Sequence, residues 1–366
     1  MYKTRQERAA AWLGSQQIDA AFIQNDSDVR YLTGMPYGSL LFLFAGGKTI
    51  LVPWDAILAE KIAYADEILP YTAYGRVIEN AFAEVLKLQA ADSGSRVEIP
   101  ASTTYLRAEK LKRVYTDNEL ICRDDGFSTF LHDCRMVKDK DELEVLKRAA
   151  SLTDQLLDEL IEQIRHKNLD SETDVALFLE SEARKRGAEG MGFETIAAGP
   201  TRSFGIHAFP AYTKEAFGTP GMSILDCGVR IDGYTSDITL TLVRGTISPL
   251  QEQMVSLVQK AYDRSAEMVK PGANTYTIAR AVDELFSEHD FSMPHALGHG
   301  IGLDVHEAPT LRNRESDSVE LQPGMVITLE PGLYHADAGG VRLENDFLVT
   351  ETGCKALTNS RILRAP

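Results

Sequence analysis

The stretch Met222–Val243, MSILDCGVRIDGYTSDITLTLV, predicts a β-hairpin that carries two acidic side chains. An apolar run leads into Asp226, the dipeptide Asp232-Gly233 is a turn signal, and the residues after it alternate between polar and apolar. The midpoint between Asp226 and Asp237 falls between Ile231 and Asp232, so we expect these two carboxylates to face each other. The Cβ atoms of facing residues lie roughly 5 Å apart, and two carboxylates held there repel each other unless a positive group lies between them. The hairpin therefore indicates a bound cation.

A second hairpin with the same arrangement is expected nearer the C-terminus. An apolar run over 325–329 ends at Glu330, a loop around Asp337 follows, and the return strand leads into Glu344. The midpoint of Glu330 and Glu344 falls at Asp337, so this pair is also expected to face across the strands. A single acid near a turn is ordinarily a solvated residue. Two facing pairs at strand ends favour one shared binding site.

Length and charge limit the class of protein. The 366 residues suffice for two domains, and 54 acidic against 38 basic residues give a formal net charge of −16. This balance argues against a nucleic-acid or anionic-membrane partner. The apolar run Leu40–Ala45 is too short to cross a membrane, and the N-terminus lacks an apolar signal core. We expect a cytoplasmic protein with neither a membrane nor a nucleic-acid partner.

Secondary-structure patterns divide the chain in two. Helices and strands alternate over residues 1–128, which predicts an α/β domain without a glycine-rich phosphate loop. A linker is expected at 129–140, where the strand pattern is lost. From Asp141 a long amphipathic helix opens a second domain, 141–366, in which further capped helices accompany the two hairpins. The second domain is therefore expected to be α+β.

The histidine-rich stretch HALGHGIGLDVHE, residues 295–307, adds a nitrogen donor to the four acids. His299 lies between Gly298 and Gly300, whose missing side chains let a ligand approach closely. A lone histidine is more often a packed or surface residue. Beside four carboxylates, however, it indicates an oxygen-rich metal site. Such a site suits manganese, cobalt or iron better than a thiolate site of the zinc type would.

Charge balance favours two metal ions at this site. Two divalent ions neutralise four carboxylates, whereas the empty site is strongly repulsive. Two-metal sites hold their ions about 3.5–4 Å apart, bind hydroxide between them at neutral pH and polarise a substrate carbonyl. The predicted chemistry is hydrolysis of an amide or an ester.

The motifs LDCG, TSD, HALGHGIGLDVHE, ITLEPG and VRLEND follow one another within residues 135–366. In this order they resemble the creatinase, aminopeptidase P and prolidase group of pita-bread-fold metallopeptidases. The first part of the chain resembles the creatinase-like N-terminal domain more loosely, mainly through VRYLTG at 29–34. The resemblance implies an α/β creatinase-like N-terminal domain and an α+β pita-bread catalytic domain.

By that resemblance, five residues hold two metals. Asp226 chelates one ion, Asp237 and Glu344 bridge both, and His299 and Glu330 complete the other site. A hydroxide bridging the metals would attack the scissile carbonyl, and Glu330 would help to move the proton. We expect manganese, with cobalt, iron or zinc as the alternatives.

Three further histidines match positions of the family, and Arg342 stands out by its place on the strand that leads into Glu344. His207, in FGIHAFP, and His306, in DVHE, would donate hydrogen bonds to the tetrahedral oxyanion. His295 opens the histidine-rich motif. Arg342 lies two residues before Glu344 on the same strand face, so it is expected to hydrogen-bond the acidic cluster. A surface or packing role is the alternative for each.

The resemblance also implies a substrate class. Family members mostly cleave the bond before a proline at the second position of a peptide. Many carry an arginine soon after VHEAP that holds a substrate carboxylate; here that position is Thr310, and Arg312 follows two residues later. The chain is thus expected to be an Xaa-Pro aminopeptidase or, with Arg312 as the clamp, an Xaa-Pro dipeptidase.

Two other readings stay open. One is a metal-independent, creatinase-like hydrolase of a small guanidino compound, and the other is a non-catalytic binding module on the same fold. The filled set of five ligand positions weighs against both. The resemblance further implies a homodimer in which the neighbouring subunit's N-terminal domain closes the pocket.

Overall fold

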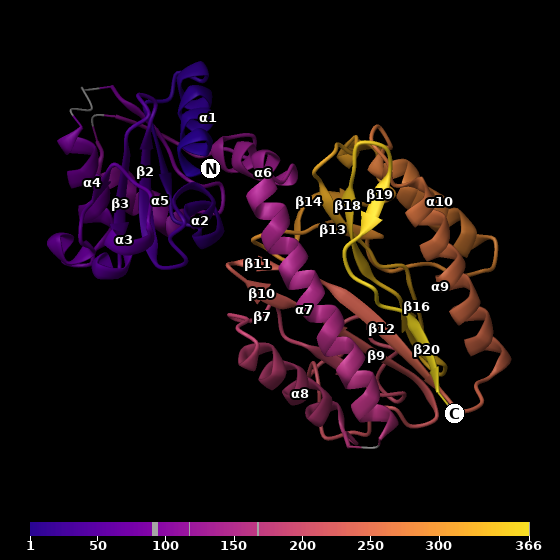
Figure 1. The fold of residues 1–366 in the computed structure, drawn as a ribbon. Coiled ribbons are helices and arrows are strands. Elements are labelled where there is room, and N and C mark those ends of the chain that lie inside the picture. Colours follow the sequence, from indigo (N-terminus) through magenta and orange to yellow (C-terminus); the bar gives the residue numbers. More distant parts are fainter. Residues whose placement is uncertain (90–93, 117, 167, 366) are drawn as a thin grey trace. The chain divides into compact units, whose positions relative to one another are not determined.

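The computed structural model describes residues 1–89, 94–116, 118–166 and 168–365. They form two compact units, Met1–Cys134 and Arg135–Pro366, coloured from indigo to magenta and from magenta to yellow in Figure 1. No helix in these ranges is both long and apolar enough to cross a membrane.

The first unit is an α/β domain built on one mixed sheet. In its described part the strand order is β4-β3-β2-β1-β5-β6, with β1 antiparallel to β2 and parallel to β5. The strands are β1 Ala20–Ile23, β2 Ser39–Phe44, β3 Thr49–Pro53, β4 Glu67–Ile68, β5 Arg96–Glu98 and β6 Glu119–Ile121. The helices are α1 Tyr2–Ser15, α2 Asp26–Thr33, α3 Ala56–Ile62, α4 Ile78–Leu88, α5 Tyr105–Val114 and α6 Phe127–Met136.

The core of this unit forms because the strands are apolar on both faces. Phe22 of β1, Phe42 of β2 and Phe82 of α4 are fully buried, with ring centroids 5.1 to 6.2 Å apart. Helix α6 occupies the first part of the expected linker. After it, Lys138 belongs to the second unit and donates its backbone N–H to the Gly324 carbonyl oxygen. The sequence-based limits of the two domains stay a prediction.

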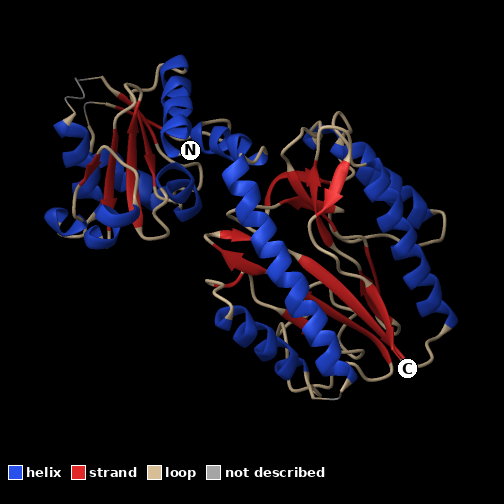
Figure 2. Ribbon diagram, in the orientation of Figure 1, coloured by secondary structure: helices blue, strands red, loops and turns tan. Residues whose placement is uncertain are grey.

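The second unit combines twisted sheets with helices that cover them (Figure 2). Its helices are α7 Lys140–Arg165, α8 Glu172–Lys185, α9 Pro249–Met268 and α10 Thr275–Ser287. Its strands are β7 Gly190–Met191, β8 Ile196–Ala198, β9 Gly221–Cys227, β10 Val229–Ile231, β11 Tyr234–Thr235, β12 Ile238–Arg244, β13 Gly298–Gly300, β14 Glu307–Leu311, β15 Val326–Leu329, β16 Gly332–His335, β17 Gly339–Arg342, β18 Asn345–Val349, β19 Cys354–Ala356 and β20 Ile362–Ala365.

Two apolar clusters lie between the sheets of this unit and the helices that pack on them. Helices α7 and α8 pack against β9 and β12 through residues such as Leu160, Leu179 and Leu240. Helices α9 and α10 pack against β15 and its neighbours through residues such as Val258 and Ile327. The strand orders are β20-β12-β9-β8 and β14-β13-β15-β18-β19. The acidic and histidine motifs lie on strands enclosed between these helix pairs (Figure 1).

The first predicted hairpin is present, but its register differs from the expectation. Asp232 and Gly233 have φ of 45° and 83°, as in a type I′ turn, so the turn closes on Ile231 and Tyr234. The same register pairs Asp226 with Thr239. The prediction that Asp226 directly faces Asp237 was therefore wrong, because the turn is centred one residue later than the midpoint assumed. The two acids are diagonal neighbours instead.

In the second hairpin the expected facing of acids is confirmed. Leu329 pairs with Asn345, and Gly332 pairs with Arg342, so this continuous register sets Glu330 opposite Glu344. Glu344 also bridges to the first hairpin, because its backbone N–H donates to the Thr239 carbonyl oxygen at 3.1 Å. The two hairpins thus meet at Thr239, which brings both acid pairs into one region.

Candidate metal centre

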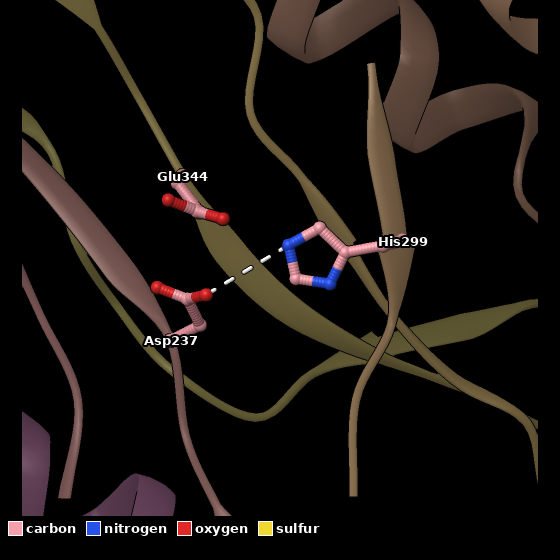
Figure 3. Close-up of side chains that lie close together, drawn as sticks. All are labelled: Asp237, His299 and Glu344. Atoms are coloured by element: carbon pink, nitrogen blue, oxygen red, sulfur yellow. Dashed lines mark ion pairs between the residues drawn. The ribbon is translucent and has the colours of Figure 1, made fainter. Parts of the chain in front are cut away.

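Three side chains from separate strands converge at the junction of the hairpins. Asp237 precedes β12, His299 is the middle residue of β13, and Glu344 lies between β17 and β18. Each offers one ligand atom, and these atoms all lie within 4.8 Å of one another. Figure 3 shows the three side chains pointing toward one another, with Nε2 of His299 3.8 Å from Oδ2 of Asp237. All three are buried.

Glu330 and Asp226 lie at the edges of this group. Oε1 of Glu330 is 3.6 Å from Nε2 of His299. Oδ2 of Asp226 accepts a 2.6 Å hydrogen bond from Arg342. Among the described residues, Oδ1 of Asp226 and Oδ1 of Asp237 are buried without a hydrogen-bond partner. The five residues singled out by sequence are therefore brought together, and two of their buried oxygens are left unsatisfied.

Burial and mutual repulsion disfavour charge on the four acids. Burial, followed by the neighbouring Glu344, raises the pKa of Asp237 and of Glu330 well above the ordinary range. Burial, followed by Asp226, raises the pKa of Glu344 to about 7. Burial also raises the pKa of Asp226, although Arg342 opposes this effect. Such a cluster gains free energy from any bound cation.

The tautomer of His299 fits a metal ligand. Burial, followed by the nearby His306, lowers the pKa of His299 to about 4, so the imidazole is neutral at pH 7. Its Nδ1 lies 3.0 Å from the carbonyl oxygen of Gly300, which can only accept, so Nδ1 carries the proton. The unprotonated Nε2 then faces the carboxylates of Asp237 and Glu330. A cation between these lone pairs would remove the repulsion.

Arg342 supplies a positive charge beside the acids. It is 2% exposed and donates to Asp226, to the Thr239 hydroxyl at 2.9 Å and to the Tyr334 hydroxyl at 2.7 Å. Thr239 in turn donates to Oε2 of Glu344 at 2.7 Å. Its described ion pair within the cluster is with Asp226, so this one positive charge cannot balance four carboxylates, and the remaining negative charge suits divalent cations.

The other histidines surround the group. The ring of His306 lies edge-on to His299, with centroids 4.4 Å apart. His207 lies on the loop between β8 and β9, and burial followed by His207 lowers the pKa of His306. His295 contacts the Tyr334 hydroxyl at 3.0 Å through Nε2, and burial lowers the pKa of His295 to about 4. These imidazoles border the acids without replacing any of the five.

Comparison with known families agrees with this geometry. Residues 144–351 match the model of metallopeptidase family M24, and residues 5–137 match that of the creatinase/prolidase N-terminal domain. The chain belongs to metallopeptidase family M24. It is therefore an enzyme of the metallopeptidase class, with a creatinase-like N-terminal domain and a pita-bread catalytic domain, as the sequence motifs predict.

Relatives of this M24 metallopeptidase match it over almost their whole length. The Xaa-Pro dipeptidase of Pyrococcus furiosus is 31% identical, with 98% of each chain covered. The crystal structure of the prolidase from Pyrococcus horikoshii superposes with a TM-score of 0.86 and 26% identity, covering 98% of this chain and 99% of that one. The X-Pro aminopeptidase from Thermotoga maritima gives a TM-score of 0.83 and 26% identity, with 99% of each chain covered.

Arg312 lies outside the acidic cluster of the M24 metallopeptidase. Its side chain is 43% exposed, and Nη1 is 4.0 Å from Asp317. It lines a cavity of about 310 Å³ that also includes His295 and Asp283. Thr310, by contrast, is the strand partner of His299. The cavity adjoins the centre through His295, whose Nδ1 is 3.8 Å from Glu330.

Sequence reasoning missed several residues that shape the centre. Asp346 is buried and accepts the backbone N–H of Asp237 at 3.1 Å, and Tyr334 joins Arg342 to His295. Thr239 links the two hairpins. Asp346 lies two residues after Glu344, so strand alternation was a signal that could have found it. No local pattern marks Tyr334 or Thr239, because their partners are distant in the chain.

Proposed function

We propose that this metallopeptidase hydrolyses the peptide bond before proline, in Xaa-Pro dipeptides or at the N-terminus of longer peptides. The observation that carries the proposal is the unprotonated Nε2 of His299, which faces carboxylate oxygens of Asp237 and Glu330 at 3.8 and 3.6 Å. Similarity to an Xaa-Pro dipeptidase, a prolidase and an X-Pro aminopeptidase supports the substrate class.

Five residues would hold two divalent ions. Asp226 would bind one ion, His299 and Glu330 the other, and Asp237 and Glu344 would contact both. We propose manganese, with cobalt, iron or zinc as alternatives, because oxygen-rich sites with one imidazole suit these ions. When bound, the ions supply an activated water nucleophile and polarise the scissile carbonyl.

The chain's own side chains handle protons and orientation. Glu330 would accept the proton of the attacking water and pass it to the leaving amine, because it lies beside both His299 and the bridging acids. His207 and His306 donate hydrogen bonds to the oxyanion as it forms. Arg342 holds Asp226 in place through its 2.6 Å bond. His295, through Tyr334, helps to hold Arg342.

Arg312 is proposed as the group that binds the carboxylate of a dipeptide substrate. Its only described ion pair is a 4.0 Å contact with Asp317, so its guanidinium has free donors. We also propose that the protein is a cytoplasmic homodimer. Sedimentation at equilibrium tests the assembly, because a mass near the 40.4 kDa of one chain would contradict it.

One experiment separates the activities. The metal-stripped protein is reloaded with manganese and given a matched pair, an Xaa-Pro dipeptide and an Xaa-Pro-Xaa tripeptide, with products read by mass spectrometry. Metal-dependent cleavage of the tripeptide indicates an aminopeptidase, and cleavage of the dipeptide alone indicates a dipeptidase. Cleavage of neither, with two metals bound, rejects the substrate class. Hydrolysis that is unchanged after metal removal rejects the metal mechanism and favours the creatinase-like alternative.

A further inference from the structure

The loop that carries His207, residues 199–213, is tied at both ends to one buried carboxylate. Oε1 of Glu172 accepts the backbone N–H of Gly199 at 2.7 Å. Oε2 of Glu172 accepts the backbone N–H and the hydroxyl of Thr213, both at 2.8 Å. The Glu172 side chain is 0% exposed. A single side chain therefore joins the two stems of the loop.

The start of helix α8 provides the platform for this carboxylate. Glu172 is the first residue of α8, directly after the capping residue Ser171. Its backbone N–H donates to the Glu215 carbonyl oxygen at 2.9 Å, which holds the stem that leaves the loop. The carboxylate of Glu172 accepts the hydrogen bond from Gly199 and so also holds the stem that enters the loop. An acid in the first helical turn is favoured by the helix dipole, so its charge is supported at this position.

Inside the loop, further polar contacts lead toward the metal centre. Arg202 has Nε 3.4 Å from Oε1 of Glu172, and its guanidinium also donates to the Pro210 carbonyl oxygen. At the inner end, the carbonyl oxygen of Ile206 accepts from Arg342 at 3.1 Å. Residue 207 is next in the chain. The backbone next to His207 is thus held by Arg342, and the stems of its loop are held by Glu172.

Apolar packing contributes little to the position of this loop. The aromatic rings that flank His207 in the sequence are those of Phe204 and Phe209, which are 48% and 96% exposed. The buried apolar residues of the loop are the small Ala208 and Ala211, and the half-buried Tyr212 packs beside them. With little apolar area to bury, the loop depends on hydrogen bonds, among which those to the Glu172 carboxylate join its two stems.

We propose that Glu172 is a positioning residue that sets His207 against the metal centre. The inference rests on the proposed function, in which His207 donates a hydrogen bond to the oxyanion. None of the described hydrogen bonds of Glu172 reaches Asp226, Asp237, His299, Glu330 or Glu344. Its effect on catalysis therefore passes through the loop, and metal binding does not depend on it.

A double-mutant cycle tests this route. Glu172→Gln replaces one carboxylate oxygen by an NH2 group, which donates and cannot accept, so one of the two stems loses its acceptor. Since a misplacement of about 1 Å costs up to about 100-fold in rate, we expect Glu172→Gln to lower kcat about 10- to 100-fold with little change in KM. In the His207→Asn background, Glu172→Gln should have no further effect. Fully multiplicative effects of the two substitutions would overturn the proposal.

Matched controls accompany the cycle. Glu180→Gln changes an exposed acid of the same helix, whose partner is Arg184 at 3.2 Å, and should leave kcat unchanged. Metal content should be equal in all variants, and loss of metal from Glu172→Gln would contradict a role confined to the loop. If Glu172→Gln does not fold, Thr213→Val removes one donor to Oε2 and takes its place in the same cycle.

A second readout does not need activity. In metal-free protein labelled with ¹³C-histidine, the His207 signal is assigned by its loss in His207→Asn. We expect Glu172→Gln to shift or broaden this signal and to leave those of the exposed His166 and His289 unchanged. An unchanged His207 signal would overturn the positioning role whatever the activity. Absence of Xaa-Pro hydrolysis by the wild-type protein would instead reject the proposed function alone.

Discussion

The guanidinium of Arg342 donates a 2.6 Å hydrogen bond to Oδ2 of Asp226, and both residues are buried. Asp226 lies on the first hairpin and Arg342 on the second, so this contact links them beside the Thr239–Glu344 bridge. The bond also leaves Oδ1 of Asp226 without a partner among the described residues. Oδ1 is therefore the oxygen of Asp226 that remains available as a metal ligand.

Replacement of Arg342 should weaken metal binding. Arg342→Met removes the charge that holds Asp226, and loss of such an outer partner typically lowers metal affinity about 10- to 100-fold. Competition with a fluorescent chelator measures the change. Arg364→Met, which removes an exposed ion pair with Glu252, serves as the control and should have no effect. Equal affinity in wild type and Arg342→Met would contradict the role given to Arg342.

Removal of the metal should destabilise the catalytic unit. Ligand at a hundred times its Kd adds about 2.7 kcal/mol to the free energy of unfolding, because it binds only the folded state. Urea unfolding followed by circular dichroism, with manganese or with chelator, measures this difference. Asp237→Asn should abolish both the stabilisation and the hydrolysis, whereas the surface substitution Asp263→Asn should keep both. A manganese effect that survives in Asp237→Asn would argue against this site.

The free energy of unfolding should fall at acidic pH as Glu307 becomes protonated. Burial alone would raise its pKa, but Lys138 and Arg135 lower the pKa to about 2. Because the folded-state pKa lies below the ordinary 4.5, the stabilisation is present above about pH 4.5 and is lost as the pH falls toward 2. The loss amounts to about 3 kcal/mol. Nζ of Lys138 is 3.1 Å from Oε2 of Glu307.

The measurement compares wild type with Glu307→Gln in urea at a series of pH values. We expect the two free energies of unfolding to differ at pH 7 and to converge as the pH falls to about 2. Glu315→Gln, which alters an exposed acid, should follow the wild-type curve. A difference that persists undiminished at pH 2 would show that packing, not charge, explains the effect.

Arg312 should matter for dipeptides more than for longer peptides. Arg312→Ala removes the proposed carboxylate ligand and should raise KM for an Xaa-Pro dipeptide about tenfold, equivalent to about 1.4 kcal/mol, while sparing a tripeptide amide. Arg314→Ala is a matched control, because Arg314 contacts the same Asp317, at 3.4 Å. Equal effects on both substrates would remove Arg312 from the substrate site.

Turn chemistry explains which strand pairings could be predicted. The loop around Asp337 is symmetrical, so the midpoint of Glu330 and Glu344 predicted their facing correctly. The type I′ turn at Asp232-Gly233 places the centre of the first hairpin one residue after the midpoint of Asp226 and Asp237, so the same reasoning failed there. A midpoint is reliable only when the turn type is known.

Local sequence patterns also failed to predict short elements that lack strong periodicity. Helix α2 has eight residues, with the Asn25 side chain as its N-cap and Gly34 at φ 80° as its end. These caps are visible in the sequence, but the apolar stripe is too short to separate a helix from a loop. Helix α6, in the expected linker, is a second such case.

The ligand types, the order of the motifs and the placement of acids at strand ends follow from local sequence, because turns and strand alternation depend on neighbouring residues. Only the tertiary structure decided that Thr239 joins the hairpins, that Arg342 reaches Asp226 and that Glu172 ties both stems of the His207 loop. These contacts join residues far apart in the chain. They form when α7, α8, α9 and α10 pack against the sheets and enclose the polar groups, which must then find partners among themselves.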